Sequence, residues 1–269
     1  MIKILDQTSI TLTDSNSKLG FSSAGSDAWP AWDRFITYDS RNLYHIGNIC
    51  GTCNFFFSKL EETSKISIDS YNLIENLNEG IKSINHELVS QYSKLFPNDH
   101  YEVLLIEFFP HLVFPKDSDD YFAKDLWETW QKERFQEEED TKTEYYRGSD
   151  KKILNEEKIY EFYIPIYPIK NLNADRVKYY EDLIRNEKKP TALSISILDV
   201  KSPCDFPIIN GEEKYPEIST HWCFANYILD GHHKIFAASN LRKSITLVTF
   251  LSHNQSWKYI EEFVNHCKT

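Results

Sequence analysis

Five consecutive residues of this chain carry the groups best suited to bind or transfer a phosphate: Asp230, Gly231, His232, His233 and Lys234. Imidazoles titrate near neutral pH, so His232 and His233 are candidates for general acid–base catalysis. Asp230 is a third catalytic candidate, because its carboxylate can orient an imidazole or hold a metal ion that bridges phosphates. Lys234 adds a fixed positive charge. Together these groups predict a site for a phosphorylated ligand.

A strand, a tight turn and a helix are expected to position these residues. The apolar segment Phe224–Leu229 indicates the strand, Asp230 and Gly231 the turn, and His232–Leu241 the helix. Gly231 can adopt backbone angles that a side chain would forbid. The first N–H groups of a helix have no partner inside it, and the helix dipole favours an anion there. The alternative is that Asp230 only caps the helix and that both imidazoles form local hydrogen bonds.

Three further residues are expected to face the same site. Arg176 stands near the start of a helix predicted over 175–184. Lys189 and Thr191 lie at the start of a strand predicted over 192–200. The predicted ligand-binding residues are therefore Gly231, Lys234, Arg176, Lys189 and Thr191.

This order of elements resembles the ParB/sulfiredoxin-like fold, in which a helix, a Lys/Gln-Pro strand start and a DGHHR-x-x-A turn build a nucleotide or phosphate pocket. The resemblance covers about the last 110 of the 269 residues. Lys234 stands where the family commonly has arginine, which keeps the charge but loses the two-pronged hydrogen bonding of a guanidinium. His232 stands where sulfiredoxins have a catalytic cysteine, so sulfinic-acid reduction is not implied. The family includes nucleotide-binding DNA-partition proteins and kinases of small hydroxylated substrates, and the fold does not choose among them.

We expect an α+β fold with two regions. Residues 156–269 are expected to form the ParB/sulfiredoxin-like mixed sheet with helices, including a strand over 244–251. Residues 1–155 indicate an aromatic-rich α+β region of unknown role that packs against this sheet. Apolar residues at helical spacing predict one long helix over 69–96, and a continuous apolar run predicts a strand over 101–109.

A Cys-x-x-Cys spacing at Cys50 and Cys53 leaves three interpretations open. The pair can supply half of a zinc site, or it can form a redox couple. Zinc would need ligands from far away in the sequence, such as His221 or Cys223, because no second Cys-x-x-Cys follows. The third interpretation is two structural thiols at a tight turn around Gly51, and we expect this one, without a bound metal.

Composition limits the kinds of partner. With 41% hydrophobic and 14% aromatic residues, 269 residues suffice for a packed core. A net charge of -11 disfavours nucleic acid, which usually binds to a basic face. No apolar run is long enough to span a membrane, and the N-terminus turns polar too early for a signal peptide. Five cysteines in a long acidic chain favour a reducing environment, so we expect a cytoplasmic protein without a membrane partner, monomeric or oligomeric.

Three functions are open at this point. The first is a protein that binds a nucleotide, with or without Mg²⁺, or another small phosphorylated ligand; as an enzyme it would be a phosphotransferase or hydrolase. The second is a non-catalytic interaction scaffold, and the third, which the acidic charge disfavours, is a nuclease or DNA-binding protein. Lys234 is expected at the surface, so Lys234→Ala should weaken phosphate binding without unfolding the chain. Gly231→Val should damage local folding if Gly231 has a positive φ.

Overall fold

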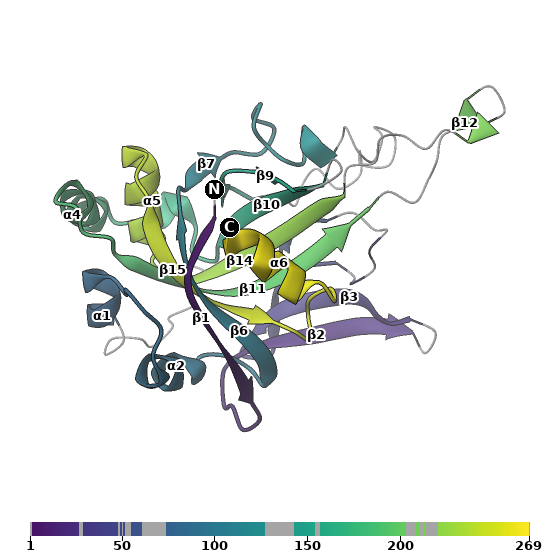
Figure 1. Cartoon of the computed structure of the whole chain (residues 1–269), viewed down its shortest axis with the longest axis horizontal. Helices are drawn as coiled ribbons and strands as arrows, with labels where there is room; N and C mark the ends of the chain where they lie inside the picture. Colours follow the sequence, from purple (N-terminus) through teal and green to yellow (C-terminus); the bar gives the residue numbers. More distant parts are fainter. Residues whose placement is uncertain are drawn as a thin grey trace.

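The computed structural model describes residues 2–26, 29–47, 49, 51, 55–60, 74–126, 143–153, 157–202, 208–209, 212–213 and 220–268. These residues form a nine-stranded sheet, a four-stranded sheet and a two-stranded ribbon, with helices around the large sheet (Figure 1). The predicted α+β fold class is confirmed.

The large sheet has the strand order β1-β6-β15-β11-β14-β10-β8-β7, and β9 pairs with β10. Its strands are β1 (Lys3–Leu12), β6 (Asp99–Phe108), β7 (His111–Val113), β8 (Tyr145–Arg147), β9 (Lys151–Lys152), β10 (Lys158–Pro165), β11 (Thr191–Lys201), β14 (His221–Asp230) and β15 (Ile245–Ser252). The sheet is mixed, because β14 runs parallel to β10 and antiparallel to β11. β6 pairs directly with β15. Residues 1–155 and 156–269 therefore contribute strands to one sheet.

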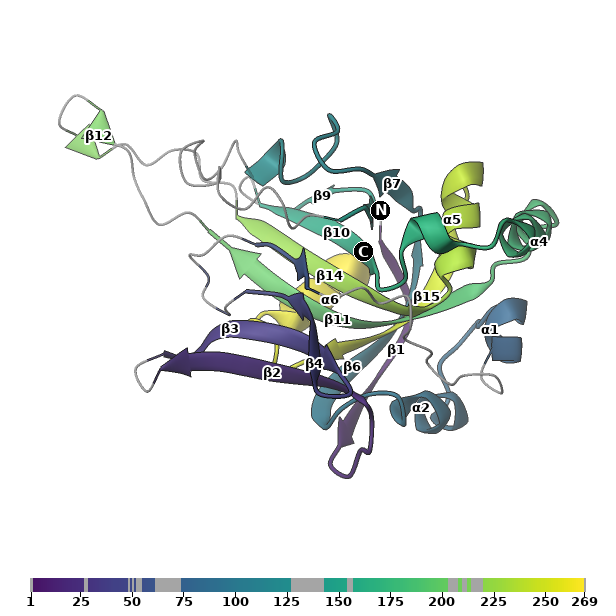
Figure 2. The ribbon, with the colours of Figure 1, turned by 180° about the vertical axis from the view of Figure 1, so that it is seen from behind.

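The small sheet lies over one face of the large sheet (Figure 2). It consists of β2 (Leu19–Ser26), β3 (Trp29–Tyr38), β4 (Arg41–His45) and β5 (Ser58–Lys59) in that order. A buried ion pair joins the two sheets, since Arg34 on β3 donates to the carboxylate of Asp199 on β11 at 3.1 and 3.2 Å. The hydroxyl of Tyr44 also donates to the Pro165 carbonyl at 2.8 Å. The remaining pair of strands, β12 (Ile208–Ile209) and β13 (Glu212–Glu213), forms the ribbon.

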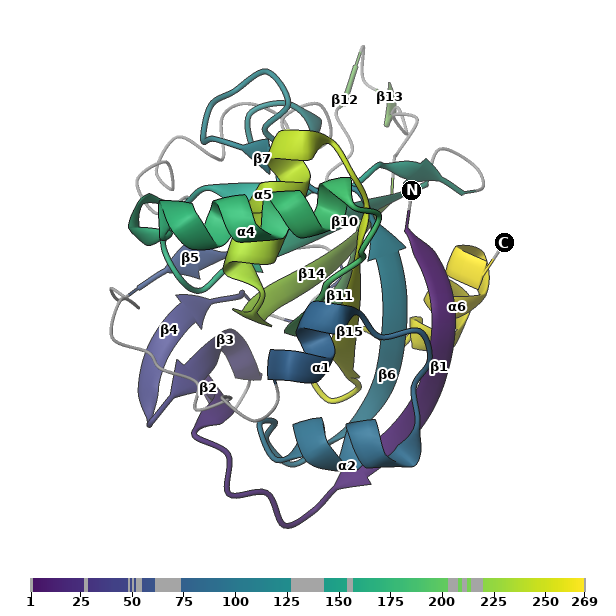
Figure 3. The same ribbon diagram turned by 90° about the vertical axis from the view of Figure 1, so that its left-hand side faces the viewer.

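Helices lie around the large sheet (Figure 3). The helices are α1 (Ile74–Glu79), α2 (His86–Ser93), α4 (Ala174–Arg185), α5 (His232–Leu241) and α6 (Ile260–Lys268), with a 3-10 turn, η4, at Ile169–Asn171. α4 packs on α5, and both α1 and α5 contact β11. The predicted site lies at the start of α5.

The single long helix predicted over 69–96 is wrong. Among the described residues of that segment, α1 ends at Glu79 and α2 begins at His86. Gly80 has a φ of +87°, and the Lys189 carbonyl occupies the space that a Cβ would need there. The backbone turns out of the helix at Gly80, and Asn85 caps the next helix by accepting from the N–H of Leu88 at 2.8 Å.

Several predicted elements are confirmed. The helix expected over 175–184 is α4, the strand over 192–200 is β11, and the strand over 244–251 is β15. The strand over 101–109 is β6. Among the described helices, none is both long enough and apolar enough to cross a bilayer.

Cys50 and Cys53 lie outside the described residues, so the metal-free tight turn stays a prediction. Gly51, which lies between them, accepts a hydrogen bond from the N–H of Ser202 at 2.8 Å through its carbonyl. This contact links the segment to the end of β11.

Candidate functional site

The turn between β14 and α5 has the predicted form. β14 ends at Asp230, Gly231 takes the left-handed conformation with a φ of 98°, and α5 begins at His232. A Cβ added at Gly231 would lie 2.6 Å from the Cβ of Ala192 on β11. Glycine is therefore required twice here, once by the backbone angle and once by the close approach of β11.

Lys234 is buried, with 1% of its surface exposed, which contradicts the expectation of a surface lysine. Its ammonium donates to the Thr191 carbonyl at 2.9 Å and to the Asp230 carboxylate at 3.2 Å. It also lies 5.7 Å from the centre of the Tyr180 ring. The side chain points back over the turn because helical side chains tilt toward the N-terminus of their helix. Burial lowers the pKa of Lys234, and the charge of Asp230 opposes this shift.

The Asp230 side chain is more exposed to solvent than that of Lys234, its ion-pair partner. Its side chain is 23% exposed, whereas that of Lys234 is 2% exposed. Among the described residues, the hydrogen-bond donor to this carboxylate is the Lys234 ammonium. Lys234 thus holds one carboxylate oxygen, Oδ2, and the described residues provide no hydrogen-bond donor to the other.

Thr191 lies behind the site rather than in it. Its side chain is fully buried, and its hydroxyl accepts from the N–H of Ile81 at 2.8 Å. The same hydroxyl shares a hydrogen bond of 2.6 Å with Thr246. Because its carbonyl binds Lys234, Thr191 connects the turn to the loop after α1. The sequence predicts that Thr191 contacts the ligand; in the structure, its carbonyl supports Lys234 instead.

His232 has a structural role at this site, because it connects the turn to the segment after β10. Its Nε2 accepts a hydrogen bond from the N–H of Tyr167 at 3.1 Å. Burial lowers the pKa of His232 to about 4, while the charge of Asp230 and a hydrogen bond to the backbone of Ile228 oppose the shift. The ring is therefore neutral at pH 7 and holds the segment after β10 against the turn.

His233, the next residue, has a similar structural role. Its Nε2 accepts from the N–H of Asn173 at 3.1 Å. Burial, followed by the charge of Arg176, lowers the pKa of His233. Asn173 in turn caps α4, because its side chain accepts from the N–H of Arg176 at 3.0 Å. The His233 imidazole thus fixes where α4 begins relative to α5.

Arg176 lies near the turn, because its charge acts on His233 and on Lys234. Its side chain is exposed and stands in the first turn of α4. Burial raises the pKa of Tyr180, and a hydrogen bond from Arg176 opposes that increase. The Tyr180 hydroxyl also donates to the Asn78 side chain at 2.9 Å. Tyr180 and Asn78 were not predicted as site residues, although the i, i+4 spacing of Arg176 and Tyr180 is a visible signal.

Lys189 is not brought to the turn. Its ammonium pairs with the Glu107 carboxylate on β6, which also accepts from the Ser244 hydroxyl at 2.6 Å. Burial alone would raise the pKa of Glu107, but the hydrogen bonds from Lys189 and Ser244 lower it overall. Lys189 therefore belongs to a separate contact between β6 and the start of β11.

A cavity of about 370 Å³ is lined by residues between Glu79 and Tyr92, none of which belongs to the turn itself. Ile81 contributes to its wall and hydrogen-bonds to Thr191, which also holds Lys234. Burial, followed by the charge of Asp230, raises the pKa of Tyr92 to about 12. The cavity is thus within electrostatic reach of the turn.

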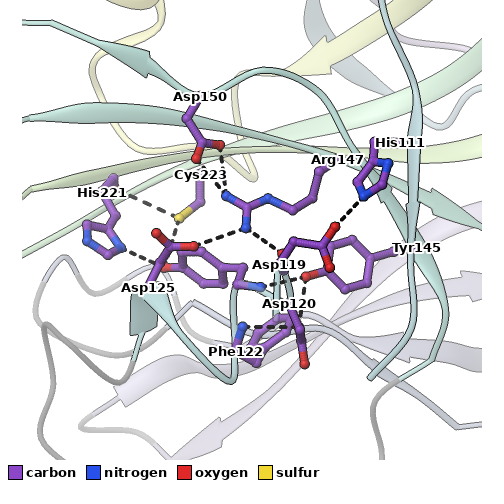
Figure 4. A network of polar contacts seen from close by, with 11 residues as sticks. His111, Asp119, Asp120, Phe122, Asp125, Tyr145, Arg147, Asp150, His221 and Cys223 are labelled. Carbon is purple, nitrogen blue, oxygen red and sulfur yellow. Dashed lines mark hydrogen bonds and ion pairs between the residues drawn. The ribbon is translucent and has the colours of Figure 1, made fainter. Parts of the chain in front are cut away.

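A second polar network lies among β8, β14 and the residues after β7 (Figure 4). Arg147 donates to both oxygens of Asp150 at 2.8 and 2.7 Å and to Asp125 at 3.0 Å. It also donates to the Asp119 carbonyl at 2.7 Å. Buried polar groups with partners of this kind stabilise a fold, so we assign this network a structural role.

His221 and Cys223, which the sequence offered as distant zinc ligands, lie in the same network. His221 Nδ1 hydrogen-bonds to the Tyr121 hydroxyl at 2.8 Å, and that hydroxyl lies 3.7 Å from the Cys223 sulfur. Burial lowers the pKa of His221 to about 3 and raises the pKa of the Cys223 thiol. A protonated, buried thiol is a poor nucleophile and a poor metal ligand.

Comparisons of the chain with models of protein families, with curated proteins and with solved structures find no match. The class of the protein therefore comes from its own geometry. It is an α+β protein whose strand–turn–helix site is supported by a buried lysine and two neutral imidazoles.

Proposed function

We propose that the protein binds a small phosphorylated ligand, of the nucleotide or phosphosugar class, at the turn from Asp230 to Lys234. The observation that carries this proposal is the start of α5. Gly231 begins the helix in the left-handed conformation, and within the described residues no side chain caps the helix. The first N–H groups of α5 therefore offer donors to an anion, and the helix dipole favours its charge.

The local charge supports the same proposal. Arg176 is an exposed positive charge near the turn, while the charge of buried Lys234 is balanced by its ion pair of 3.2 Å with Asp230. Both imidazoles are neutral at pH 7, since burial lowers the pKa of each. The whole chain has a net charge of -11. A single exposed guanidinium on such a chain favours a small anion over a nucleic acid, which needs a wide basic face.

Arg176 is the residue best placed to bind the phosphate directly. A guanidinium binds phosphate oxygens through two parallel hydrogen bonds, and the Arg176 side chain is exposed. Charge-assisted hydrogen bonds contribute roughly 1.5–3 kcal/mol each, and the helix end adds about 0.3–1 kcal/mol. A few such contacts correspond to a dissociation constant between about 1 mM and 1 µM.

Asp230 is the candidate for chemistry at this site. With His232 and His233 engaged as hydrogen-bond acceptors, the solvent-facing oxygen of Asp230 is the group left to accept a proton or to hold Mg²⁺ beside a nucleotide. The imidazoles then act as positioning residues. If the protein is an enzyme, a phosphotransfer or hydrolytic reaction would use Asp230 as the base.

We infer that the cavity between Glu79 and Tyr92, which the Ile81–Thr191 hydrogen bond connects to the turn, holds the rest of the ligand. Its volume of about 370 Å³ falls in the range of small-molecule pockets. Its lining carries one positive charge, Lys82, and two carboxylates, Glu79 and Glu87, so it suits the uncharged part of a ligand rather than the phosphate. The resemblance of this stretch to ParB/sulfiredoxin-like proteins, which bind nucleotides or phosphates at the corresponding turn, supports the same class of ligand.

A cytoplasmic location belongs to this proposal. The described cysteines, Cys223 and Cys267, are buried free thiols. Free thiols are typical of a reducing compartment, where small phosphorylated metabolites and nucleotides are abundant.

Calorimetric titration tests the proposal. The wild-type protein is titrated with ATP and ADP, with and without Mg²⁺, with a phosphosugar and with inorganic phosphate. Arg176→Gln should weaken binding by about tenfold, because it removes one charged hydrogen bond. Arg185→Gln is the matched control, since Arg185 is exposed in the last turn of the same helix and pairs with Glu181 and Asp182.

Two outcomes would contradict the proposal. The first is that the wild-type protein binds none of these compounds, which would favour the non-catalytic scaffold. The second is that Arg176→Gln and Arg185→Gln bind them equally well. A buried Lys234 makes Lys234→Ala unsuitable for this test, because the substitution would also disturb the fold.

A further inference from the structure

We propose that His100, Glu102 and His253 form a binding site for a divalent transition-metal ion, with Zn²⁺ as the best fit. Their ligand atoms all lie within 4.8 Å of one another. Two imidazoles and one carboxylate are a ligand set typical of zinc sites that keep a fourth position for water. The proposal is independent of phosphate binding at the Gly231 turn.

Strand pairing brings the three residues together. His100 and Glu102 are two residues apart on β6, so their side chains point to the same face of the sheet. β15 pairs antiparallel with β6 and places Ser252 opposite Tyr101. The next residue, His253, donates its backbone N–H to the His100 carbonyl at 2.9 Å. The site thus lies where β6 begins and β15 ends, at the opposite end of β15 from its Thr191-paired start.

The distances suit a metal ion after a small adjustment. The two imidazole rings have centres 4.3 Å apart, and His253 Nε2 lies 3.5 Å from Glu102 Oε1. Ligand atoms around a tetrahedral zinc ion, with bonds of about 2.0–2.1 Å, lie roughly 3.4 Å apart. Small side-chain rotations therefore suffice to bring all three atoms to one ion.

One ligand atom gives separate support for a bound ion. His253 Nε2 is buried and, apart from its ion-pair contact of 3.5 Å with Glu102, has no hydrogen-bond partner among the described residues. Buried nitrogen atoms without partners are rare in folded proteins, because each loses its hydration without replacement. A metal ion bonded to this nitrogen would supply the missing partner.

Residues of β1 hold the other two ligands in place. Thr11 Oγ1 forms a hydrogen bond of 2.9 Å with His100 Nδ1, which leaves Nε2 of that ring to face the ion. Ser9 Oγ donates to Glu102 Oε1 at 2.8 Å. Strand pairing sets Ser9 opposite Glu102 and Thr11 opposite His100. Such outer contacts orient metal ligands and are a regular feature of metal sites.

The ligand types favour Zn²⁺ over Ca²⁺ or Mg²⁺. Imidazole nitrogen suits zinc and other late transition metals, whereas Ca²⁺ and Mg²⁺ prefer oxygen ligands. All three ligands are partly exposed, so an ion has access from solvent. An ion pair between His253 and Glu102 alone would contribute little to stability. It would also not account for the second imidazole, His100, beside them.

Titration of the full-length protein with Zn²⁺ tests the proposal. We expect one site per chain, with binding at least about tenfold weaker in His253→Ala and in Glu102→Gln. His111→Ala is the control, since His111 is exposed and pairs with Asp119 at another place. The double variant Cys50→Ser/Cys53→Ser should keep the site, because neither thiol is a ligand in this proposal.

Spectra of the Co²⁺-loaded protein give a second readout. Nitrogen and oxygen ligands should give weak visible bands without the strong near-ultraviolet band of cobalt–thiolate bonds. Retention of full Zn²⁺ affinity in His253→Ala would overturn the proposal. So would loss of binding in Cys50→Ser/Cys53→Ser, or no Zn²⁺ binding by the wild-type protein.

Discussion

Lys234 and Asp230 form an ion pair of 3.2 Å across the turn at Gly231, and the lysine is the buried partner. The ammonium also binds the Thr191 carbonyl on β11 at 2.9 Å. One side chain therefore joins the end of β14, the start of β11 and the first turn of α5. The Lys234 ammonium is therefore buried in the fold, and the Asp230 carboxylate is the partner that faces the solvent.

Replacing Lys234 should destabilise the protein. Lys234→Met leaves the buried Thr191 carbonyl and Asp230 without their donor, which we expect to lower the free energy of unfolding by about 1–3 kcal/mol. Urea denaturation at pH 7 measures this change. Lys178→Met is the control, because Lys178 is exposed on α4; it should change stability by no more than about 0.5 kcal/mol. Equal stabilities of the two variants would show that the Lys234 contacts contribute nothing.

Gly231→Ala should destabilise the turn for two separable reasons. An alanine at a φ of 98° is strained, at a cost of about 1–3 kcal/mol. Its Cβ would also lie 2.6 Å from the Cβ of Ala192. In a double-mutant cycle, Ala192→Gly should relieve the contact with the Ala192 Cβ, but neither the contact of 2.9 Å with the Ala192 Cα nor the backbone strain. Denaturation curves that show no coupling between the two substitutions would contradict this close approach.

Stability should depend on pH through His232. Burial lowers its pKa from 6.5 to about 4, so the unfolded chain binds more protons between these two values. The contribution of the neutral ring is therefore complete above about pH 6.5 and is lost as the pH falls toward 4. Relative to wild type, His232→Asn should lose less stability between pH 7 and pH 5.

His221→Asn provides the comparison for His232→Asn in the same urea series. Burial lowers the pKa of His221 to about 3, so it contributes in the same direction. Each variant should have a shallower acid dependence than wild type. Identical slopes for all three proteins would mean that neither imidazole is kept neutral by the fold.

Glu161 should have the opposite pH dependence. Burial raises its pKa from 4.5 to about 7 while it accepts from the Ile2 N–H at 2.7 Å and the Tyr163 hydroxyl at 3.0 Å. The folded state then binds more protons between pH 4.5 and 7, so this contribution falls as the pH rises. Glu161→Gln should gain stability relative to wild type between pH 5 and pH 8. The exposed control Glu79→Gln should not, and a parallel pH profile for both variants would refute the buried carboxyl.

Local signals in the sequence were enough to predict the strand, turn and helix of the site. The apolar run of β14, the glycine at position 231 and the amphipathic run of α5 are adjacent, so neighbouring residues determine the structure. The break at Gly80 was missed because its cause is distant. The Lys189 carbonyl, over 100 residues later, packs against that glycine.

The roles of the site residues depended on contacts that no local pattern shows. Lys234 is buried because β11 brings the Thr191 carbonyl to it. His232 and His233 accept hydrogen bonds from the backbone N–H groups of Tyr167 and Asn173. Every residue type except proline has this donor, so the sequence does not reveal such a contact. Lys189 is expected at the site because it stands at the start of the predicted strand, but its side chain pairs with Glu107 on β6 instead.

The proposed metal site illustrates the same limit. His100-x-Glu102 is visible in the sequence as a pair on one face of a strand. The third ligand follows β15, more than 150 residues later, and reaches the pair only through the β6–β15 pairing. Sheet topology, rather than spacing, brings the three ligands together.

Backbone amide spectra of ¹⁵N-labelled protein, titrated with the panel of phosphorylated compounds, test ligand binding at the turn most directly. Phosphate bound at the start of α5 should shift the amide signals of Gly231, His232 and His233 and that of Arg176. The shifts should saturate at a ligand concentration of about 1 mM or below, which corresponds to about -4 kcal/mol or tighter. Saturable shifts confined to other regions of the chain, or no shift with any compound, would contradict a phosphate site at this turn.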